Sequence, residues 1–167
     1  MLMAACRLIE VGNTLVDKVV KRISEDLDAI YAMGYDVWGE GNSYADYLEG
    51  CRTSSKYQTG TWYVLIVDGE QVSSCILYQL STNVIGIGSL ATKYDKRGRG
   101  FGTFLLKKIL SANIGRVSFL WSDINPNFYK KIGFVLIDSK LQPYDDSKLM
   151  YYPSNAVIDH TNLPTYF

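Results

Sequence analysis

The sequence predicts an α/β (α+β) protein, and three observations support this prediction. Asp68-Gly69 separates two runs rich in β-branched and aromatic residues, 61–67 and 71–80, which is typical of a hairpin closed by a type I′ turn. An apolar run over 84–91 leads through a glycine-rich turn into 102–113, where apolar residues recur at helical spacing. The rest of the chain suits a strand, a short helix and two closing strands, at 117–121, 127–132, 134–137 and 148–152.

The first 60 residues are predicted to form one strand, at 6–11, and two helices. Asn13 or Thr14 can cap the first helix, whose apolar residues recur as far as Tyr31. Residues 44–51 suit the second, shorter helix. The order of elements is then β-α-α-β-β-β-α-β-α-β-β, with neither an internal repeat nor a linker.

Length and composition indicate one ordinary domain over residues 1–167, long enough to bury about 70% of its unfolded surface. Seventeen basic and seventeen acidic residues cancel, so we expect neither nucleic acid nor an anionic membrane as a partner. Cys6, Cys51 and Cys75 are odd in number and lack metal-ligand spacing, which indicates free thiols and no metal. With no signal-peptide pattern and no apolar run of membrane-spanning length, a cytoplasmic protein is expected.

The most informative stretch is Leu90-Ala-Thr-Lys-Tyr-Asp-Lys-Arg-Gly-Arg-Gly-Phe-Gly-Thr103, which joins a strand to a helix. Its three glycines allow positive φ angles and close approach of the main chain, so that successive amides can converge on one anion. The start of the following helix adds the positive end of its dipole. The stretch lacks the Gly-Lys-Ser/Thr of a nucleotide P-loop and the six-residue dinucleotide fingerprint, so it predicts a phosphate site of another kind.

Two segments resemble the GNAT superfamily of N-acetyltransferases. Arg97-Gly98-Arg99-Gly100-Phe101-Gly102 matches the Arg/Gln-x-x-Gly-x-Gly/Ala signature that binds the pyrophosphate of acetyl-CoA in that family. The segment 119–134 resembles its other conserved block, in which Tyr129, Gly133 and Phe134 fall on the Tyr-x-x-x-Gly-Phe positions. The two motifs stand in the expected order, and the resemblance covers the chain from about Thr61 to Ile137.

The resemblance implies the GNAT fold, a mixed and mostly antiparallel sheet of about seven strands with helices on both faces. The fourth and fifth strands, 84–91 and 117–121, would splay apart and leave backbone groups for the pantetheine arm of acetyl-CoA. The ring of Phe101 is expected in the core. The cofactor-binding residues implied in this way are Leu90, Ala91, Thr92, Arg97, Gly98, Arg99, Gly100, Phe101, Gly102, Thr103, Asn125 and Phe128.

The resemblance also implies direct transfer of the acetyl group to an amine in one ternary complex, with Tyr129 as the acid that protonates the leaving thiolate. The general base is left open, because the fourth strand carries no acid where many relatives have a glutamate. Asp123, Glu40 and Asp36 are candidates, although Asp123 also suits a helix N-cap and the loop acids also suit solvated surface. Tyr78 could line the same cleft, while His160 suits a surface position better than a base.

Aromatic residues interleave with acids between Tyr35 and Glu49, which suggests a cationic acceptor resembling a polyamine, an aminoglycoside or a lysine side chain. A second interpretation is a non-catalytic acyl-CoA-binding regulatory module, which the missing acid on the fourth strand favours. The resemblance also suggests a homodimer, and the tyrosine-rich segment after 143 could pack on a partner or on its own core.

Overall fold

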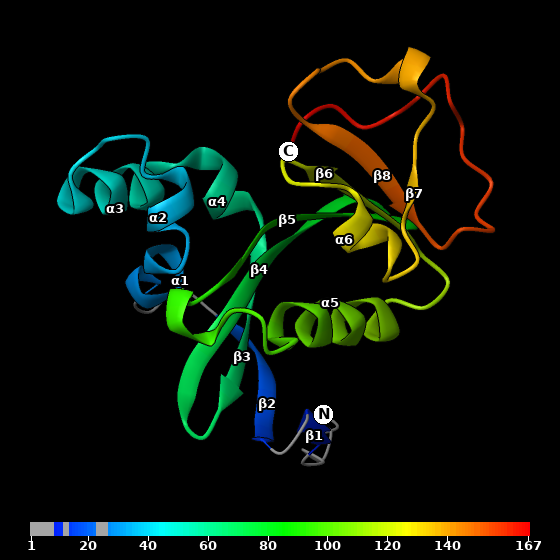
Figure 1. Cartoon of the computed structure of the whole chain (residues 1–167). Helices are drawn as coiled ribbons and strands as arrows, with labels where there is room; N and C mark the ends of the chain where they lie inside the picture. The colour runs from blue at the N-terminus through cyan, green and yellow to red at the C-terminus, as the bar shows by residue number, and fades with distance from the viewer. Residues whose placement is uncertain (1–8, 12–13, 23–26) are drawn as a thin grey trace. The chain divides into compact units, whose positions relative to one another are not determined.

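The computed structural model describes residues 9–11, 14–22 and 27–167 (Figure 1). The chain divides into two compact units. Unit 1 comprises Met1–Ile76 and Ser89–Ile109, and unit 2 comprises Leu77–Gly88 and Leu110–Phe167. The boundaries fall inside two strands and one helix, so neither unit is a continuous stretch of sequence.

The described strands pair in the order β1-β2-β3-β4-β5-β6-β8-β7. The sheet is mixed, because β5 and β6 are parallel whereas β1 with β2, β2 with β3, β6 with β8 and β7 with β8 are antiparallel. The strands are β1 (Ile9–Val11), β2 (Thr14–Arg22), β3 (Thr61–Val67), β4 (Glu70–Ser81), β5 (Val84–Thr92), β6 (Val117–Ser122), β7 (Val135–Leu136) and β8 (Lys148–Tyr152). The helices are α1 (Asp28–Ala32), α2 (Tyr35–Trp38), α3 (Tyr44–Thr53), α4 (Ser55–Thr59), α5 (Phe101–Ala112) and α6 (Asn127–Lys130), with 3₁₀ turns at Tyr94–Lys96 and Ser139–Leu141. The predicted mixed α/β fold is confirmed, with eight strands among the described residues instead of about seven.

The additional strand, β2, occupies part of the first predicted helix, and that prediction is wrong over Thr14–Arg22. These residues pair antiparallel with β3, in a register that runs from Val16↔Val67 to Arg22↔Trp62 with one irregularity. The spacing of the valines fits a helix face, but valine is β-branched and suits a pleated surface better. Helix α1 begins only at Asp28, while Asn13 and residues 6–8 lie outside the described residues.

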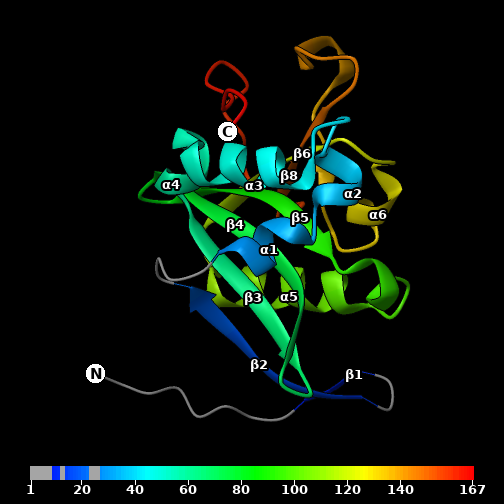
Figure 2. The same cartoon turned by 90° about the vertical axis from the view of Figure 1, so that its left-hand side faces the viewer.

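In unit 1, helices α1 to α4 gather on one side of the strands and the first turns of α5 lie on the other (Figures 1 and 2). The hairpin of β3 and β4 turns at Asp68 and Gly69, whose φ angles of 49° and 75° agree with the predicted type I′ turn. Helix α2 lies between the two predicted helices, and neither α2 nor α4 was predicted from the sequence. The core of the unit consists of buried side chains from β3, β4 and α5, including Val64, Leu65, Cys75, Ile76, Leu105 and Leu106.

In unit 2, strand β6 lies between the first half of β5 and β8. The core contains Phe119, Trp121, Ile137 and Leu149, against which parts of the segment after 152 pack. The ring of Phe167 lies directly over Gly86, where an added Cβ would come within 2.6 Å of it. The tyrosine-rich segment therefore packs on its own unit, which is one of the two arrangements that the sequence suggested.

Candidate functional site

The glycine turn between β5 and α5 has the backbone that an anion cradle requires. Gly98 and Gly100 have φ angles of 75° and 81°, in the left-handed region that glycine adopts without steric cost. Gly102 serves a different purpose, because a Cβ there would lie 3.2 Å from the Thr92 hydroxyl oxygen at the end of β5. The turn therefore brings the first amides of a twelve-residue helix close to the strand end, an arrangement that suits an anion.

Arg97 is held within unit 1 by its own protein partners. Its two terminal guanidinium nitrogens donate to the Asp36 carboxylate at 2.7 and 2.8 Å, and its Nε donates to the Thr92 carbonyl at 3.0 Å. The hydrogen bonds from the guanidinium to the carboxylate hold the pKa of Asp36 below its ordinary value. In contrast, Arg99 is exposed and makes no ion pair within the described part of the chain, so its charge is available to a phosphate.

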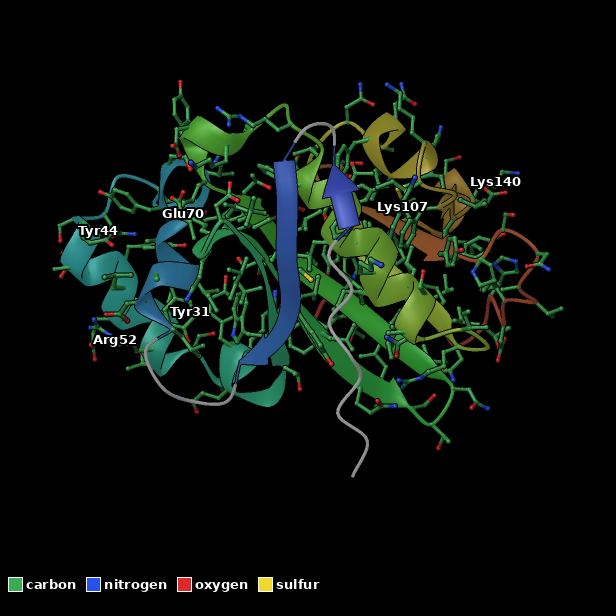
Figure 3. The ribbon with its side chains drawn as sticks, turned by 90° about the horizontal axis from the view of Figure 1, so that it is seen from below. Tyr31, Tyr44, Arg52, Glu70, Lys107 and Lys140 are labelled. Atoms are coloured by element: carbon green, nitrogen blue, oxygen red, sulfur yellow. The ribbon has the colours of Figure 1, made fainter. Side chains whose placement is uncertain are left out.

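A second acid fixes the lysines that precede the turn. Glu70, labelled in Figure 3, accepts from Lys93 at 2.9 Å and from Lys96 at 2.8 Å. The hydrogen bond from Lys96 is the largest cause that lowers the pKa of Glu70 to about 2, followed by the one from Lys93. Two of the four cations between Lys93 and Arg99 are thus tied to the start of β4, and Arg97 is tied to α2.

The end of β5 is held by side chains from within unit 1. Buried Ser73, on β4, donates its hydroxyl to the Ala91 carbonyl at 2.8 Å and lies 2.9 Å from the Thr92 hydroxyl. Together with the bond from Arg97 to the Thr92 carbonyl, these contacts fix the main chain of the segment expected to face the pantetheine arm. Phe101 is buried, as expected, and contributes its ring to the core.

The second motif has a structural explanation in unit 2. Tyr129 lies on α6 and is buried, with its ring 4.9 Å from that of Phe128 and 6.0 Å from that of Phe134. Gly133, with a φ of 110°, ends the helical segment, and the Phe134 amide then donates back to the Tyr129 carbonyl at 3.1 Å. The Tyr-x-x-x-Gly-Phe pattern is therefore a tyrosine packed inside a glycine-terminated helical turn.

The turn that precedes α6 carries two predicted residues. Asn125 accepts from the Asn127 amide through its side chain at 3.0 Å, whereas Asp123 is exposed. The N-cap of α6 is Pro126, without a capping side chain, so the alternative reading of Asp123 as that cap is not what the structure shows. Both residues belong to unit 2, as do Phe128 and Tyr129, whereas the glycine turn belongs to unit 1.

The acid-rich segment of unit 1 is more internally paired than the sequence suggested. The ring of Tyr35 lies 5.2 Å from the ring of Tyr44 and 5.2 Å from that of Tyr47. Arg52, labelled in Figure 3, pairs with Asp28 and Glu49. Because Asp36 is bound to Arg97, the charge of this segment is partly neutralised.

Two candidates for the base differ in their surroundings. Glu40 is exposed, has a φ of 49° and has no described hydrogen-bonding partner, whereas Asp36 is held by a guanidinium. His160 is exposed, as expected, and Tyr78 is buried with its ring 5.6 Å from that of Phe167.

Sequence reasoning missed the partners of these residues. Near the end of β5, Ser73 donates to the Ala91 carbonyl and Tyr57 accepts from Ser89, while Asp36 pairs with Arg97 in the turn. Each of these contacts joins parts of the chain that are distant in the sequence. The described residues contain no group of three or more His, Cys, Asp or Glu side chains able to hold a metal ion. Within that same part of the chain, none of the helices combines the length and the apolar character that crossing a membrane would take.

Comparison with known proteins gives a family and a fold. Residues 58–136 match the family model of the acetyltransferase (GNAT) domain, whereas a comparison with curated protein sequences found no match. The ribosomal-protein-S18-alanine N-acetyltransferase from Escherichia coli has a similar structure, with a TM-score of 0.61 and 15% identity over 90% of this chain and 99% of that one.

Two further solved structures are similar. An aminoglycoside 6′-N-acetyltransferase complexed with coenzyme A has a TM-score of 0.60 and 14% identity over 85% of this chain and 99% of that one. A spermidine N-acetyltransferase chimera from Vibrio cholerae and hSSAT has a TM-score of 0.59 and 14% identity over 80% and 93%. At such identities the similarity shows the fold.

The residues that match the family model include both the glycine turn and the segment around Tyr129, the two motifs on which the resemblance was based. The resemblance that the two motifs indicated is confirmed over residues 58–136, the part of the chain that matches the acetyltransferase (GNAT) domain.

Proposed function

We propose that the chain is an N-acetyltransferase that transfers the acetyl group of acetyl-CoA to a primary amine by direct attack in a ternary complex. The observation that carries this proposal is the backbone of the glycine turn. Its two left-handed glycines and the tight approach of Gly102 to Thr92 are what a pyrophosphate cradle at a helix N-terminus requires. The family match over 58–136 supports an acyl-CoA as the ligand of this cradle.

Acetyl-CoA, when bound, supplies an acyl group activated as a thioester. The main-chain amides from Gly98 to Thr103 would hold its diphosphate, and exposed Arg99 would screen the phosphate charge. Arg97 is better placed as a support of the turn, because Asp36 and the Thr92 carbonyl already occupy its guanidinium. The main chain of Leu90 to Thr92 would bind the pantetheine amides and offer an N–H to the carbonyl oxygen of the acetyl group.

Tyr129 would donate the proton that the departing thiolate needs, and the attacking amine would lose its proton to a base acting through water. Glu40 is the first candidate for that base, because it is exposed and has no described partner, while Asp36 is held as the counter-ion of Arg97. Asp123, exposed at the end of β6, is the second.

The acceptor that we propose is a cationic primary amine, such as one on a polyamine, an aminoglycoside or a lysine side chain. The acidic and aromatic character of residues 35–49 supports this choice, as does the carboxylate of Glu40. Enzymes of similar fold are named for aminoglycosides and for spermidine.

The test measures release of coenzyme A from acetyl-CoA across a panel of polyamines, aminoglycosides, lysine-containing peptides and neutral arylamines. We expect transfer to the cationic amines, and transfer to arylamines alone would contradict the proposed acceptor class. Replacing Tyr129 with Phe should lower kcat by about 100-fold with little change in the Kd of coenzyme A, because only the acid is removed. Unchanged turnover in Tyr129→Phe would exclude that phenol as the acid.

A second candidate function is a non-catalytic module that binds acyl-CoA. Two observations favour it: β5 carries no acid, and the Asp36 carboxylate is bound to Arg97. In that case calorimetry would detect binding of coenzyme A, and substitutions in the glycine turn would weaken it. No amine in the panel would cause release of coenzyme A from acetyl-CoA.

A further inference from the structure

Strand β5 contains a backbone conformation that its sequence does not explain. Ser89 has a φ of 46°, one of three non-glycine residues of the described chain with a positive φ. The other two, Glu40 and Asp68, lie in exposed turns, whereas Ser89 is half-buried inside a strand. A left-handed residue with a Cβ is sterically unfavourable and persists only where its surroundings hold it.

One side chain is positioned to hold it. The Ser89 hydroxyl donates to the phenol oxygen of Tyr57 at 3.2 Å. Tyr57 lies on α4, and its ring stacks on that of Tyr31 with centroids 5.7 Å apart and meets the edge of Trp62 at 5.2 Å. The N-cap of the helix, Ser54, accepts from the Tyr57 amide at 3.3 Å.

The phenol therefore belongs to a packed aromatic group of unit 1. Burial raises the pKa of Tyr57, which remains protonated at neutral pH. A rigid, neutral hydroxyl of this kind can determine the conformation of the backbone next to it.

The conformation of Ser89 matters because of what comes before and after it in the chain. The register of β5 with β6 ends at Ile87↔Leu120, two residues earlier. The segment from Leu90 to Thr92 follows at once, and its far end is fixed by Ser73 and Arg97. The left-handed residue thus sets the direction of a short main-chain segment whose other end is anchored.

We propose that Tyr57 is a positioning residue for acetyl transfer, which acts through its hydrogen bond with Ser89 to hold the left-handed turn in β5. The turn orients the main chain of Leu90 to Thr92, so that its amides face the thioester carbonyl and the pantetheine arm. This inference rests on the proposed function, in which the main chain of Leu90 to Thr92 binds acetyl-CoA. Neither Tyr57 nor Ser89 needs to touch the reacting atoms.

The test uses the full chain and four variants: Tyr57→Phe, Ser89→Ala, Ser89→Gly and the double variant Tyr57→Phe/Ser89→Gly. Glycine adopts the left-handed conformation without help, so Ser89→Gly removes the hydroxyl but keeps the turn. Alanine removes the hydroxyl and retains the steric conflict. Tyr63→Phe is the matched control, because Tyr63 is another half-buried phenol of unit 1, on β3.

We expect Tyr57→Phe and Ser89→Ala to lower kcat about tenfold, because a displaced amide stabilises the reacting carbonyl less well. The Kd of coenzyme A, measured by calorimetry, should stay within about twofold, since the glycine turn supplies most of that affinity. Ser89→Gly should recover most of kcat and melt about 2–4 °C above Ser89→Ala, and Tyr57→Phe should have no effect in the Ser89→Gly background. Tyr63→Phe should behave as the wild type.

Wild-type kcat in Tyr57→Phe and Ser89→Ala would overturn the proposal, and so would Ser89→Gly as impaired as Ser89→Ala. An equal effect of Tyr57→Phe in both backgrounds would show that the phenol acts by packing or on a ligand, which also overturns it. If the wild type transfers no acetyl group to any amine, the proposed function fails. The melting temperatures of the same variants then still decide whether Tyr57 holds Ser89.

Discussion

At the scale of single residues, Gly98 and Gly102 serve the turn in different ways. Gly98 has a φ of 75° and nothing within 4 Å of the position of an added Cβ, so only its backbone angle demands glycine. Gly102 has an ordinary helical backbone and is demanded by its contact with Thr92. The first glycine shapes the cradle and the third sets the distance between helix and strand.

Gly98→Ala should therefore weaken binding of coenzyme A about tenfold, because the left-handed angle costs alanine about 1–2 kcal/mol. Gly69→Ala is its matched control, since Gly69 has the same φ of 75° and equally open surroundings in the β3–β4 turn. Calorimetry should give wild-type affinity for Gly69→Ala, and thermal melting should show that both variants fold. Equal affinities for coenzyme A in the two variants would exclude the backbone of Gly98 from the binding site.

The sequence was informative about this turn because the requirement is local. A left-handed backbone needs glycine at that position, and a run of such glycines between a strand and a helix has few alternative explanations. It was not informative about the protein partner of Arg97, whose guanidinium donates to Asp36, 61 residues away. A partner so distant in the chain leaves no mark on the local pattern.

At the scale of elements, the same distinction separates correct from wrong predictions. The β3–β4 hairpin was predictable because Asp68-Gly69 specifies its own turn. Strand β2 was not, because valines at helical spacing also fit a strand, and pairing with β3 decides between the two. Helix α4 is five residues long and packs one ring, that of Tyr57, on Tyr31, so an apolar periodicity of 3.6 cannot be recognised in so short a segment.

The segment after β8 packs on strand β5 through the ring of Phe167, which lies over Gly86. Phe167→Ala should lower the free energy of unfolding by about 2 kcal/mol, since it opens a cavity over the strand. Gly86→Ala should lower it by about 1–3 kcal/mol in the wild type, because its methyl group would overlap the ring. In the Phe167→Ala background the same methyl group should be neutral or stabilising.

Urea unfolding of the two single variants and the double variant measures this reversal. Gly50→Ala serves as the control for the glycine-to-alanine exchange itself, because Gly50 lies exposed on α3 with nothing near an added Cβ, and it should raise stability slightly. Additive losses in the double variant would mean that Phe167 does not lie over Gly86 in solution.

At the scale of the whole molecule, both motifs lie within one family domain, but they belong to different compact units. The fold class could be predicted because the two motifs occur together and in the expected order, whereas the acyl-CoA ligand stays a prediction. The general base could not, because its identity depends on which carboxylates remain unpaired after folding. Among the three candidates for the base, the Asp36 carboxylate is paired with Arg97, whereas Glu40 and Asp123 are exposed.

A direct transfer requires both substrates on the protein at once, and the described cysteines give no route through an acetylated thiol. Cys51 and Cys75 are 6% and 0% exposed, and burial raises the pKa of both thiols, that of Cys75 to about 12. Initial-velocity plots with the two substrates varied should therefore intersect, and mass spectrometry after incubation with acetyl-CoA alone should detect no acetyl-enzyme. Cys6→Ser, which removes the thiol outside the described residues, should retain full activity. Parallel plots together with an acetylated side chain would replace the ternary complex by a two-step reaction.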